Sequence, residues 1–256
     1  MKTDLFAGRY VYGLGVIALA LVCFAWGGFD PGQPVPKTFP YRDALAAVAA
    51  TFMLVTGAAV LWQRTTAWAA AALVLYYTFV VVILLNGRLA VLHYKDFVSY
   101  SGTAEQLAIA AGGLILYAAY SGIDAIRAAQ FTRAAQIVFG ICAVLFGIAH
   151  FVYMNFTAPL VPKWLPPSQM FWGYATGVAQ IAAGIAILTG VQARLAAILL
   201  TAMYASFVFL VHAPAIWASP HDHGAWAEAA ETIALVGVAW LVADSFARGW
   251  RMQKTI

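Results

Sequence analysis

Apolar residues occur in eight long runs, which are separated by shorter segments rich in charged residues, proline or glycine. The runs lie near residues 10–28, 43–62, 67–86, 104–121, 135–154, 170–189, 195–213 and 229–245. About 20 apolar residues are enough for one helix to cross a bilayer. The runs show none of the apolar–polar alternation that a barrel strand needs. The pattern therefore predicts an all-α polytopic membrane protein with eight transmembrane helices.

The two halves of the chain repeat each other in the order and spacing of these runs. At an offset of 126 or 127 residues, Val35-Pro36-Lys37 matches Val161-Pro162-Lys163, Gly57 matches Gly184, and Glu105 matches Glu231. Because four spans return the chain to its starting side, both units share one orientation, as in a parallel internal repeat. We expect two four-helix bundles, residues 1–126 and 127–256.

Composition and charge place the chain in a membrane and predict its orientation. The 256 residues are 64% hydrophobic and only 9% charged, whereas soluble domains carry about 25% charged residues. We expect the first apolar run to be a retained helix rather than a cleaved signal peptide. Nine basic residues lie in the termini and the loops on the same side, and five lie on the other side. This bias predicts a bacterial-type inner-membrane protein with both termini in the cytoplasm, and the net charge of +4 gives no reason to expect nucleic-acid binding.

Two equivalent outer loops, residues 30–40 and 158–167, are rich in proline. Proline fixes φ and stiffens a loop, so we expect these segments to cap the helix ends. Trp164 and Trp172 flank the second loop. Two interpretations stay open for them: an aromatic belt at the membrane interface, or the entrance to a ligand site.

The candidate site combines two histidines with a carboxylate in the second half. His150 lies near the end of the fifth expected helix, His212 closes the seventh, and Glu231 opens the eighth. An ionisable residue within a membrane span suggests function. A neutral histidine can donate a hydrogen bond to a quinone carbonyl, and a carboxylate can exchange the accompanying proton. Tyr153 and Trp172 offer ring surfaces for stacking, and Trp164 completes the expected quinone-binding set.

A structural interpretation of the same residues also stays open. Glu105 and Glu231 are expected to begin helices, where a carboxylate is favoured by the helix dipole. A buried histidine can simply satisfy a backbone carbonyl. In the first half, Asn86 matches His212, while His150 has only an apolar counterpart near Phe24 or Ala25. We therefore expect the functional site in the second half.

His221 and His223 are candidate metal ligands in the loop before the last helix. Two histidines alone make an incomplete site, so His150 or His212 would have to join them; a solvated polar loop is the alternative. The sequence holds none of the phosphate-loop, nucleophile-elbow or zinc-protease signatures. We therefore assign no catalytic residue and leave open whether the protein is an enzyme.

Four motifs of the second half resemble the DoxX-like membrane proteins. They are Gly147-Ile-Ala-His150-Phe151, Val161-Pro-Lys-Trp-Leu-Pro166, Trp172-x-Tyr-x-Thr-Gly177 and Ala183-Gly-Ile-Ala-Ile-Leu188, with Glu231 further on. The resemblance covers residues 135–245 well and residues 10–122 as a divergent copy. It implies four-helix units, a link to quinone-coupled or thiol-redox systems, and a periplasmic or membrane redox protein as partner. By resemblance, His150, the 161–166 loop, Trp172 and Glu231 are carried over as functional positions.

Three functions remain open at this point. The first is an integral membrane component of a quinone-linked redox system, which binds its ligand in an outer-face pocket of the second unit. The second is a non-catalytic scaffold or accessory subunit that contacts partners through small-residue helix faces such as Gly112-Gly113 and Gly184. The third is a small-molecule transporter, which is disfavoured because few charged residues lie within the helices. The first requires His150, His212 and Glu231 to meet in a cavity.

Overall fold

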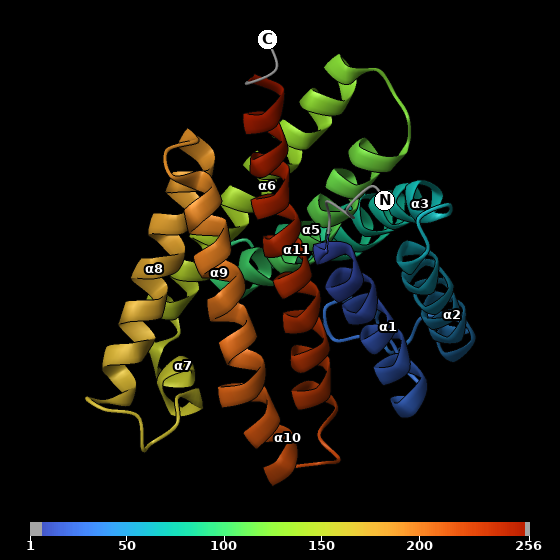
Figure 1. The fold of residues 1–256 in the computed structure, drawn as a ribbon. Helices are drawn as coiled ribbons and strands as arrows, with labels where there is room; N and C mark the ends of the chain where they lie inside the picture. Colours follow the sequence, from blue (N-terminus) through green and yellow to red (C-terminus); the bar gives the residue numbers. More distant parts are fainter. Residues whose placement is uncertain (1–6, 254–256) are drawn as a thin grey trace.

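The protein is helical throughout the part described by a computed structural model, which covers the backbone of residues 7–253 and the side chains of residues 7–247 (Figure 1). No strand occurs within this part. Seven of its helices are long and apolar enough to cross a membrane: Gly8–Trp26, Arg42–Leu61, Thr66–Leu92, Ala125–Val152, Gln169–Thr189, Ala193–Ala218 and His223–Ala247. The expected all-α polytopic membrane protein is confirmed at this level.

The described helices follow one another with short connections, and two of the long ones contain a π-helical stretch. In chain order they are α1 (Gly8–Trp26), α2 (Arg42–Leu61), α3 (Thr66–Leu75), η1 (Tyr76–Asn86), α4 (Gly87–Leu92), α5 (Phe97–Tyr120), α6 (Ala125–Val152), α7 (Met154–Leu160), α8 (Gln169–Thr189), α9 (Ala193–Phe207), η2 (Val208–His212), α10 (Ala213–Ala218) and α11 (His223–Gln253).

The helix α5 corresponds to the fourth expected span, but it is not among the seven apolar helices. It has 24 residues and carries Glu105 and Gln106 within its length, which lowers its hydropathy. It packs against α3, α6 and α11, so protein rather than lipid surrounds much of it. Its start at Phe97 also corrects the expected start near residue 104, because a hydropathy pattern marks only the apolar part of a helix.

Two further helix starts were placed too late for the same reason. The helix α6 begins at Ala125 instead of near 135, and Asp124 caps it by accepting a hydrogen bond from Arg127 N at 2.9 Å. The helix α11 begins at His223 instead of near 229. The segments 122–134 and 212–227, which we expected to be loops, are therefore largely helical.

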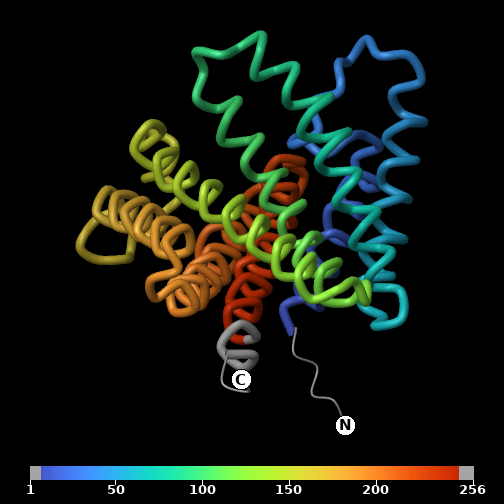
Figure 2. The backbone as a smooth tube through the Cα atoms, turned by 90° about the horizontal axis from the view of Figure 1, so that it is seen from above, coloured from blue at the N-terminus to red at the C-terminus, as the bar shows by residue number. Residues whose placement is uncertain are grey.

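The long helix α11 lies in the middle of the molecule, with α8 and α9 on one side and α1 and α2 on the other (Figure 1). Seen from above, the blue and cyan segments of the first half and the yellow and orange segments of the second lie on opposite sides of α11 (Figure 2). The helices α1 and α11 run antiparallel, because Gly8 lies beside Leu241 and Gly15 beside Ala234. The described chain thus begins and ends toward the same end of the bundle.

Glycines bring neighbouring helices into backbone contact. A Cβ atom on Gly184 of α8 would lie 2.6 Å from the carbonyl oxygen of Gly140 on α6, and one on Gly147 would lie 2.6 Å from that of Gly177. In α1, a Cβ atom on Gly13 would lie 2.9 Å from the carbonyl oxygen of Gly57 on α2. Close approach of this kind is how helices associate where lipid supplies no hydrophobic driving force.

The two π-helical stretches end at matching places. The stretch η1 ends at Asn86 and is followed by the six residues of α4, while η2 ends at His212 and is followed by the six residues of α10. The expected apolar runs 67–86 and 195–213 therefore each contain a π-helical stretch near their end. Stretches of π-helix are rare and are found frequently at functional sites.

We predict that Gly184→Ala lowers the free energy of unfolding by about 1–3 kcal/mol, because its new methyl group meets the backbone of α6. The measurement is reversible unfolding of the purified protein in mixed micelles. The matched control is Gly102→Ala in α5, since nothing lies within 4 Å of a Cβ atom there. This variant should be neutral or more stable by up to about 1 kcal/mol. Equal effects of the two substitutions would contradict the packing argument.

Candidate functional site

A cavity of about 1270 Å³ lies between α5, α6, α7, α8, α9 with η2, and α11. Four of the expected ligand-binding residues line it together: His150, Tyr153, Trp172 and His212. Most of the other lining residues are apolar or aromatic. Pockets for drug-sized ligands typically measure about 300–1,000 Å³, so this cavity has room for a lipophilic molecule with part of its chain.

Two expected residues are placed elsewhere. Trp164 is 71% exposed in the loop after α7 and does not line the cavity. Glu231 also lies outside the lining, and its Oε1 accepts a hydrogen bond from Gln106 Nε2 at 2.6 Å. The carboxylates on the cavity wall are instead those of Asp96, Glu105 and Glu228.

The cavity is not confined to the second half, as the sequence had suggested. The beginning of α5, which belongs to the first half, supplies Phe97, Ser101 and Glu105 to its wall. Neither Glu105 nor Glu231 caps a helix, because α5 begins eight residues before Glu105 and α11 begins eight residues before Glu231. The structural interpretation of these glutamates as helix caps is therefore wrong.

His150 is held by hydrogen bonds on both sides of its ring. Its Nδ1 lies 3.1 Å from the carbonyl oxygen of Gly173 and 3.1 Å from Thr176 Oγ1. Its Nε2 lies 3.0 Å from Gln180 Nε2. A carbonyl oxygen can only accept, so Nδ1 carries the proton, and in the neutral ring Nε2 accepts from the Gln180 amide. The expected donation from His150 to a ligand carbonyl is therefore taken up by Gly173.

Two buried polar atoms on the cavity wall have no hydrogen-bond partner among the residues that the structure describes. They are Gln180 Oε1, on a side chain that is 2% exposed, and the hydroxyl oxygen of Tyr204, which is 3% exposed. Buried polar groups are nearly always paired, so an orphan needs an explanation. Because both residues line the cavity, a ligand that enters it is the simplest partner for both atoms.

His212 also reaches the cavity from the end of η2, where it is buried. Its Nε2 lies 2.9 Å from Thr232 Oγ1 on α11. This contact joins the end of η2 to α11. The two histidines thus approach the same cavity from α6 and η2 without contacting each other in any hydrogen bond of the described chain.

The loop between α1 and α2 folds into the first half and fills it with polar contacts. Gln33 Oε1 accepts from the hydroxyl of Tyr76 at 2.8 Å, and Asn86 Nδ2 donates to the carbonyl oxygen of Gly32 at 3.0 Å. Asp30 accepts from Gly32 N at 2.8 Å, yet its Oδ2 has no partner in the described part of the chain. Burial raises the pKa of this carboxyl group to about 6. The expected cap over the helix ends is therefore partly an insertion into the bundle.

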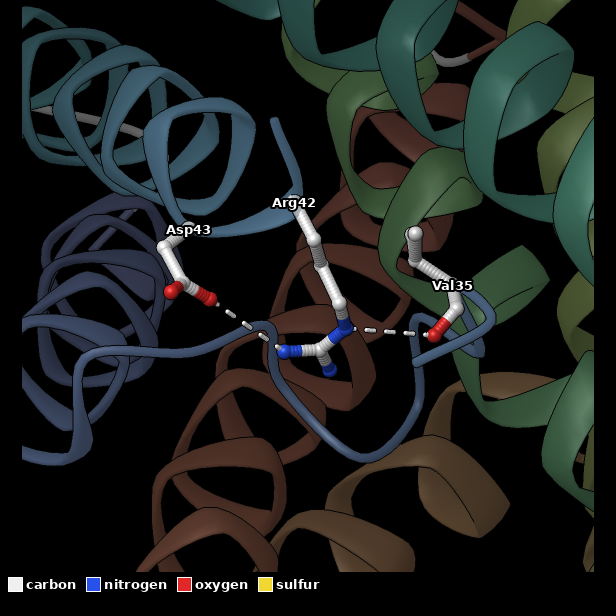
Figure 3. Close-up of polar contacts among 3 residues, drawn as sticks. All are labelled: Val35, Arg42 and Asp43. Carbon is white, nitrogen blue, oxygen red and sulfur yellow. Dashed lines mark hydrogen bonds and ion pairs between the residues drawn. The ribbon is translucent and has the colours of Figure 1, made fainter. Parts of the chain in front are cut away.

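Arg42 holds this loop at the start of α2. Its Nε donates to the carbonyl oxygen of Val35 at 3.4 Å, and its guanidinium lies 3.9 Å from the carboxylate of Asp43 (Figure 3). The guanidinium also lies over the ring of Phe29, at 5.5 Å from its centroid. One side chain thus contacts both ends of the inserted segment.

The second proline-rich loop covers the cavity instead of filling it. The indole nitrogen of Trp172 donates to the carbonyl oxygen of Pro166 at 2.8 Å, and Gln169 donates to that of Val161 at 2.5 Å. Val161 and Pro162 line the cavity. The position of Trp172 beneath this loop agrees with a ligand entrance better than with a lipid-facing belt.

The two loop histidines do not form a metal centre with other ligands. His221 is exposed, while the ring of His223 stacks on that of Trp26 at 5.1 Å between centroids. Among residues with described side chains, no group of three or more His, Cys, Asp or Glu is arranged to hold a metal ion. Cys23 and Cys142 are both free and buried, as expected.

Gln180 and Tyr204 are two residues of the cavity wall that were not predicted, although the sequence carries a signal for Gln180. Gln180 is an amide inside an otherwise apolar span, and polar residues within a membrane span mark candidate sites. Tyr204 gave no comparable signal, because tyrosine is common in these helices. Only the packing of α8 beside α9 shows that both face the cavity.

Comparison with known proteins gives one match. Residues 139–245 match the model of a family described as a domain of unknown function (DUF8561). The matched part runs from within α6 to within α11, and so covers the four long helices of the second half. No curated protein and no solved structure shows significant similarity to the chain. The resemblance to the DoxX-like proteins therefore stays a prediction.

The buried carboxyl group of Asp30 makes stability depend on pH. The folded protein binds its proton more tightly than the unfolded chain, whose carboxyl group has a pKa of 3.8. The protonated carboxyl group therefore makes its full contribution to folding stability below about pH 4, and this contribution is lost as the pH rises through about 6. We predict that the free energy of unfolding of Asp30→Asn rises relative to that of the wild type by up to about 3 kcal/mol as the pH increases from about 4 to about 6. Unfolding measured from pH 4 to 8 tests this, and a constant difference would contradict it.

We predict that His150→Ala lowers the free energy of unfolding by about 2–4 kcal/mol, because it removes the imidazole from a buried position, breaks its hydrogen bond to Gly173 O and leaves the Gln180 amide without its partner. Chemical unfolding in detergent measures the loss. The matched control is His221→Ala on the exposed loop, whose effect should stay within about 0.5 kcal/mol. If the two variants were equally stable, the hydrogen bonds of His150 would contribute nothing to the fold.

Proposed function

We propose that this protein is an integral membrane protein that binds a quinone, or a similar lipophilic ring compound, in the cavity between α5, α6, α8, α9 and α11. The observation that carries the proposal is the pair of orphaned buried atoms, Gln180 Oε1 and the Tyr204 hydroxyl, on the wall of a large apolar cavity. We further propose that it serves as the quinone-facing membrane component of a redox system.

The lining residues fit such a ligand chemically. The side chains of Phe97, Tyr153 and Trp172 offer apolar ring surface, and aromatic rings pack well against one another in offset or edge-to-face arrangements. The Tyr204 hydroxyl can donate to a ligand oxygen, and Gln180 can hold a ligand at its free amide oxygen. A bound quinone would supply two-electron chemistry, while these residues orient its ring and exclude water.

The two-unit architecture with eight spans is part of the same proposal, and several observations support it. The glycine contact of Gly13 with Gly57 has its counterpart in that of Gly140 with Gly184, at an offset of 127 residues. The pairing of α1 with α11 corresponds to that of α6 with α5. The family match covers one such four-helix set. In this architecture α5 is the fourth of the eight spans, shielded from lipid by its neighbours.

Orientation and partner follow from the charge bias and from the resemblance to the DoxX-like proteins. With an even number of spans, both termini lie on one side, in agreement with α1 beginning beside the later part of α11. The basic loops favour the cytoplasm for that side. The cavity then lies toward the outer face of an inner membrane, where a periplasmic or membrane redox protein is the expected partner.

The small-residue helix faces do not support the alternative that the protein is a scaffold. Gly112 packs against Tyr12 and Val238, and Gly184 packs against Gly140 and Val144. These glycines are thus used for contacts within the chain. No other observation on the described residues favours a scaffold over a binding protein.

We predict that purified protein contains co-extracted quinone and binds an added short-chain quinone, as measured by lipid-extract mass spectrometry and by titration in nanodiscs. Ala175→Trp should weaken this binding at least about tenfold, because the indole would occupy the cavity that Ala175 lines. The binding of the same quinone to empty nanodiscs gives the baseline.

The matched control is Val178→Trp on the same helix. Val178 is 56% exposed and does not line the cavity, so the binding of quinone should remain within about twofold of the wild type. Absence of quinone from the extract, together with no binding in the titration, would overturn the proposed function. Equal losses in both variants would show that the ligand does not bind in this cavity.

A further inference from the structure

We propose that the cavity recognises a hydroxyl group on its ligand, so that it binds the reduced, quinol form in preference to the oxidised quinone. This inference rests on the proposed function, because it specifies which form of the ligand the same cavity takes. The structural basis is a chain of hydrogen bonds with a fixed direction, which runs from Gly173 through His150 and Gln180 to the cavity.

The direction of this chain is set at its far end. The Gly173 carbonyl oxygen can only accept, and it lies 3.1 Å from His150 Nδ1, so that nitrogen carries the ring proton. The hydroxyl of Thr176 donates to the Trp172 carbonyl oxygen at 2.7 Å, so it too is placed to accept from Nδ1. The neutral ring therefore presents a lone pair at Nε2.

The amide of Gln180 must then turn its nitrogen toward the histidine. Gln180 Nε2 lies 3.0 Å from His150 Nε2 and donates to it. No carboxylate in the described part of the chain forms an ion pair with His150, which agrees with a neutral ring. The orientation of the amide leaves Oε1 free, and this oxygen is an acceptor that cannot donate.

Gln180 Oε1 therefore needs a donor from whatever occupies the cavity. The side chain is 2% exposed and the oxygen has no partner among the described residues. A quinone carries carbonyl oxygens at its polar ring positions and offers only acceptors. It would therefore leave Gln180 Oε1 unpaired and place another acceptor oxygen next to it. A quinol carries hydroxyl groups at the same positions and can donate, which satisfies the amide oxygen.

The hydroxyl of Tyr204 is compatible with the same form. It is buried on the cavity wall without a partner. A hydroxyl group can both donate and accept, so Tyr204 pairs with either form of the ligand and does not discriminate between them. The preference for the reduced form therefore resides in Gln180, and Tyr204 adds affinity for both forms.

The first half offers an internal comparison. At the offset of 127 residues that relates the glycine contacts, the counterparts of His150, Gln180 and Tyr204 are Cys23, Met53 and Tyr77. This offset moves the counterpart of His150 by one residue from the expected Phe24. The sulfur of Met53 accepts from the Tyr77 hydroxyl at 3.4 Å and from the amide nitrogen of Gln33 at 3.5 Å. Gln33 belongs to the inserted loop, so here the chain itself brings a donor to the acceptor at this position. The second half lacks such an insertion and leaves the corresponding acceptor to a ligand.

The test compares three ligands on the full-length wild-type protein in nanodiscs. They are a decyl-substituted benzoquinol, the corresponding benzoquinone, and the bis-methyl ether of the quinol, which keeps the ring but cannot donate. We expect the quinol to bind about tenfold more tightly than either of the others, as one buried hydrogen bond to an amide implies. A tenfold preference also raises the two-electron midpoint potential of the bound ligand by about 30 mV.

The variant Gln180→Met removes the amide oxygen. It should bind the quinol about tenfold more weakly than the wild type and the quinone about equally well, and so lose the preference for the quinol. The control is Gln136→Met, which replaces a buried amide of α6 that pairs with Ser245 outside the cavity. This variant should keep the preference. If Gln180→Met does not fold, the comparison of the three ligands on the wild-type protein still tests whether the quinol is preferred.

The outcomes separate the two proposals. Binding of all three ligands with equal affinity would overturn the inference while leaving the proposed function intact. Tighter binding of the quinone than of the quinol would also overturn it, because that result requires the opposite orientation of the Gln180 amide. Failure of all three ligands to bind would overturn the proposed function itself. Binding of a decyl alcohol as tightly as the quinol would show that a hydroxyl group is recognised without the ring.

Discussion

Backbone contact between α6 and α8 is the constraint on which the rest of the second half depends. Lipid provides no hydrophobic force that drives helices together, so these helices associate by close packing. Gly147 and Gly177 allow that approach, since a Cβ atom on Gly177 would lie 2.8 Å from the Cβ atom of His150. Only at this separation does the imidazole of His150 reach the carbonyl oxygen of Gly173 and the amide of Gln180. The glycines thus determine the direction of the hydrogen bonds at the cavity wall.

A second constraint is that polar groups within a bilayer must find partners inside the protein. The two halves meet it differently. In the first half, Gln33 and Gly32 of the inserted loop pair with Tyr76 and Asn86. In the second half, the proline-rich loop is held above the cavity by Trp172, and polar atoms on the wall stay unpaired. The same arrangement of helices therefore gives a filled interior on one side and a cavity on the other.

The sequence predicted the seven long apolar helices, because the hydropathy of a segment follows directly from its composition. It also predicted that His150, Tyr153, Trp172 and His212 gather, since it places all four near the outer ends of their helices. It placed Glu231 in the cavity where the structure places Glu228. The face that a helix turns inward is set by contacts such as Gly237 against Tyr12, and a hydropathy pattern does not contain that information. The insertion of Asp30 and Gln33 into the bundle was missed for the same reason.

The last helix of each half completes the site of the other half. The helix α5 supplies Phe97 and Glu105 to the cavity of the second half. In return, Glu231 of α11 accepts from Gln106 of α5, whose amide lies against Gly32 of the inserted loop. In the proposed two-unit architecture, a single four-helix unit would lack one wall of its interior, so it would need a second copy to close it. Joining two such units in one chain would provide that wall permanently, and it would allow one interior to be filled by its own loop while the other keeps a cavity.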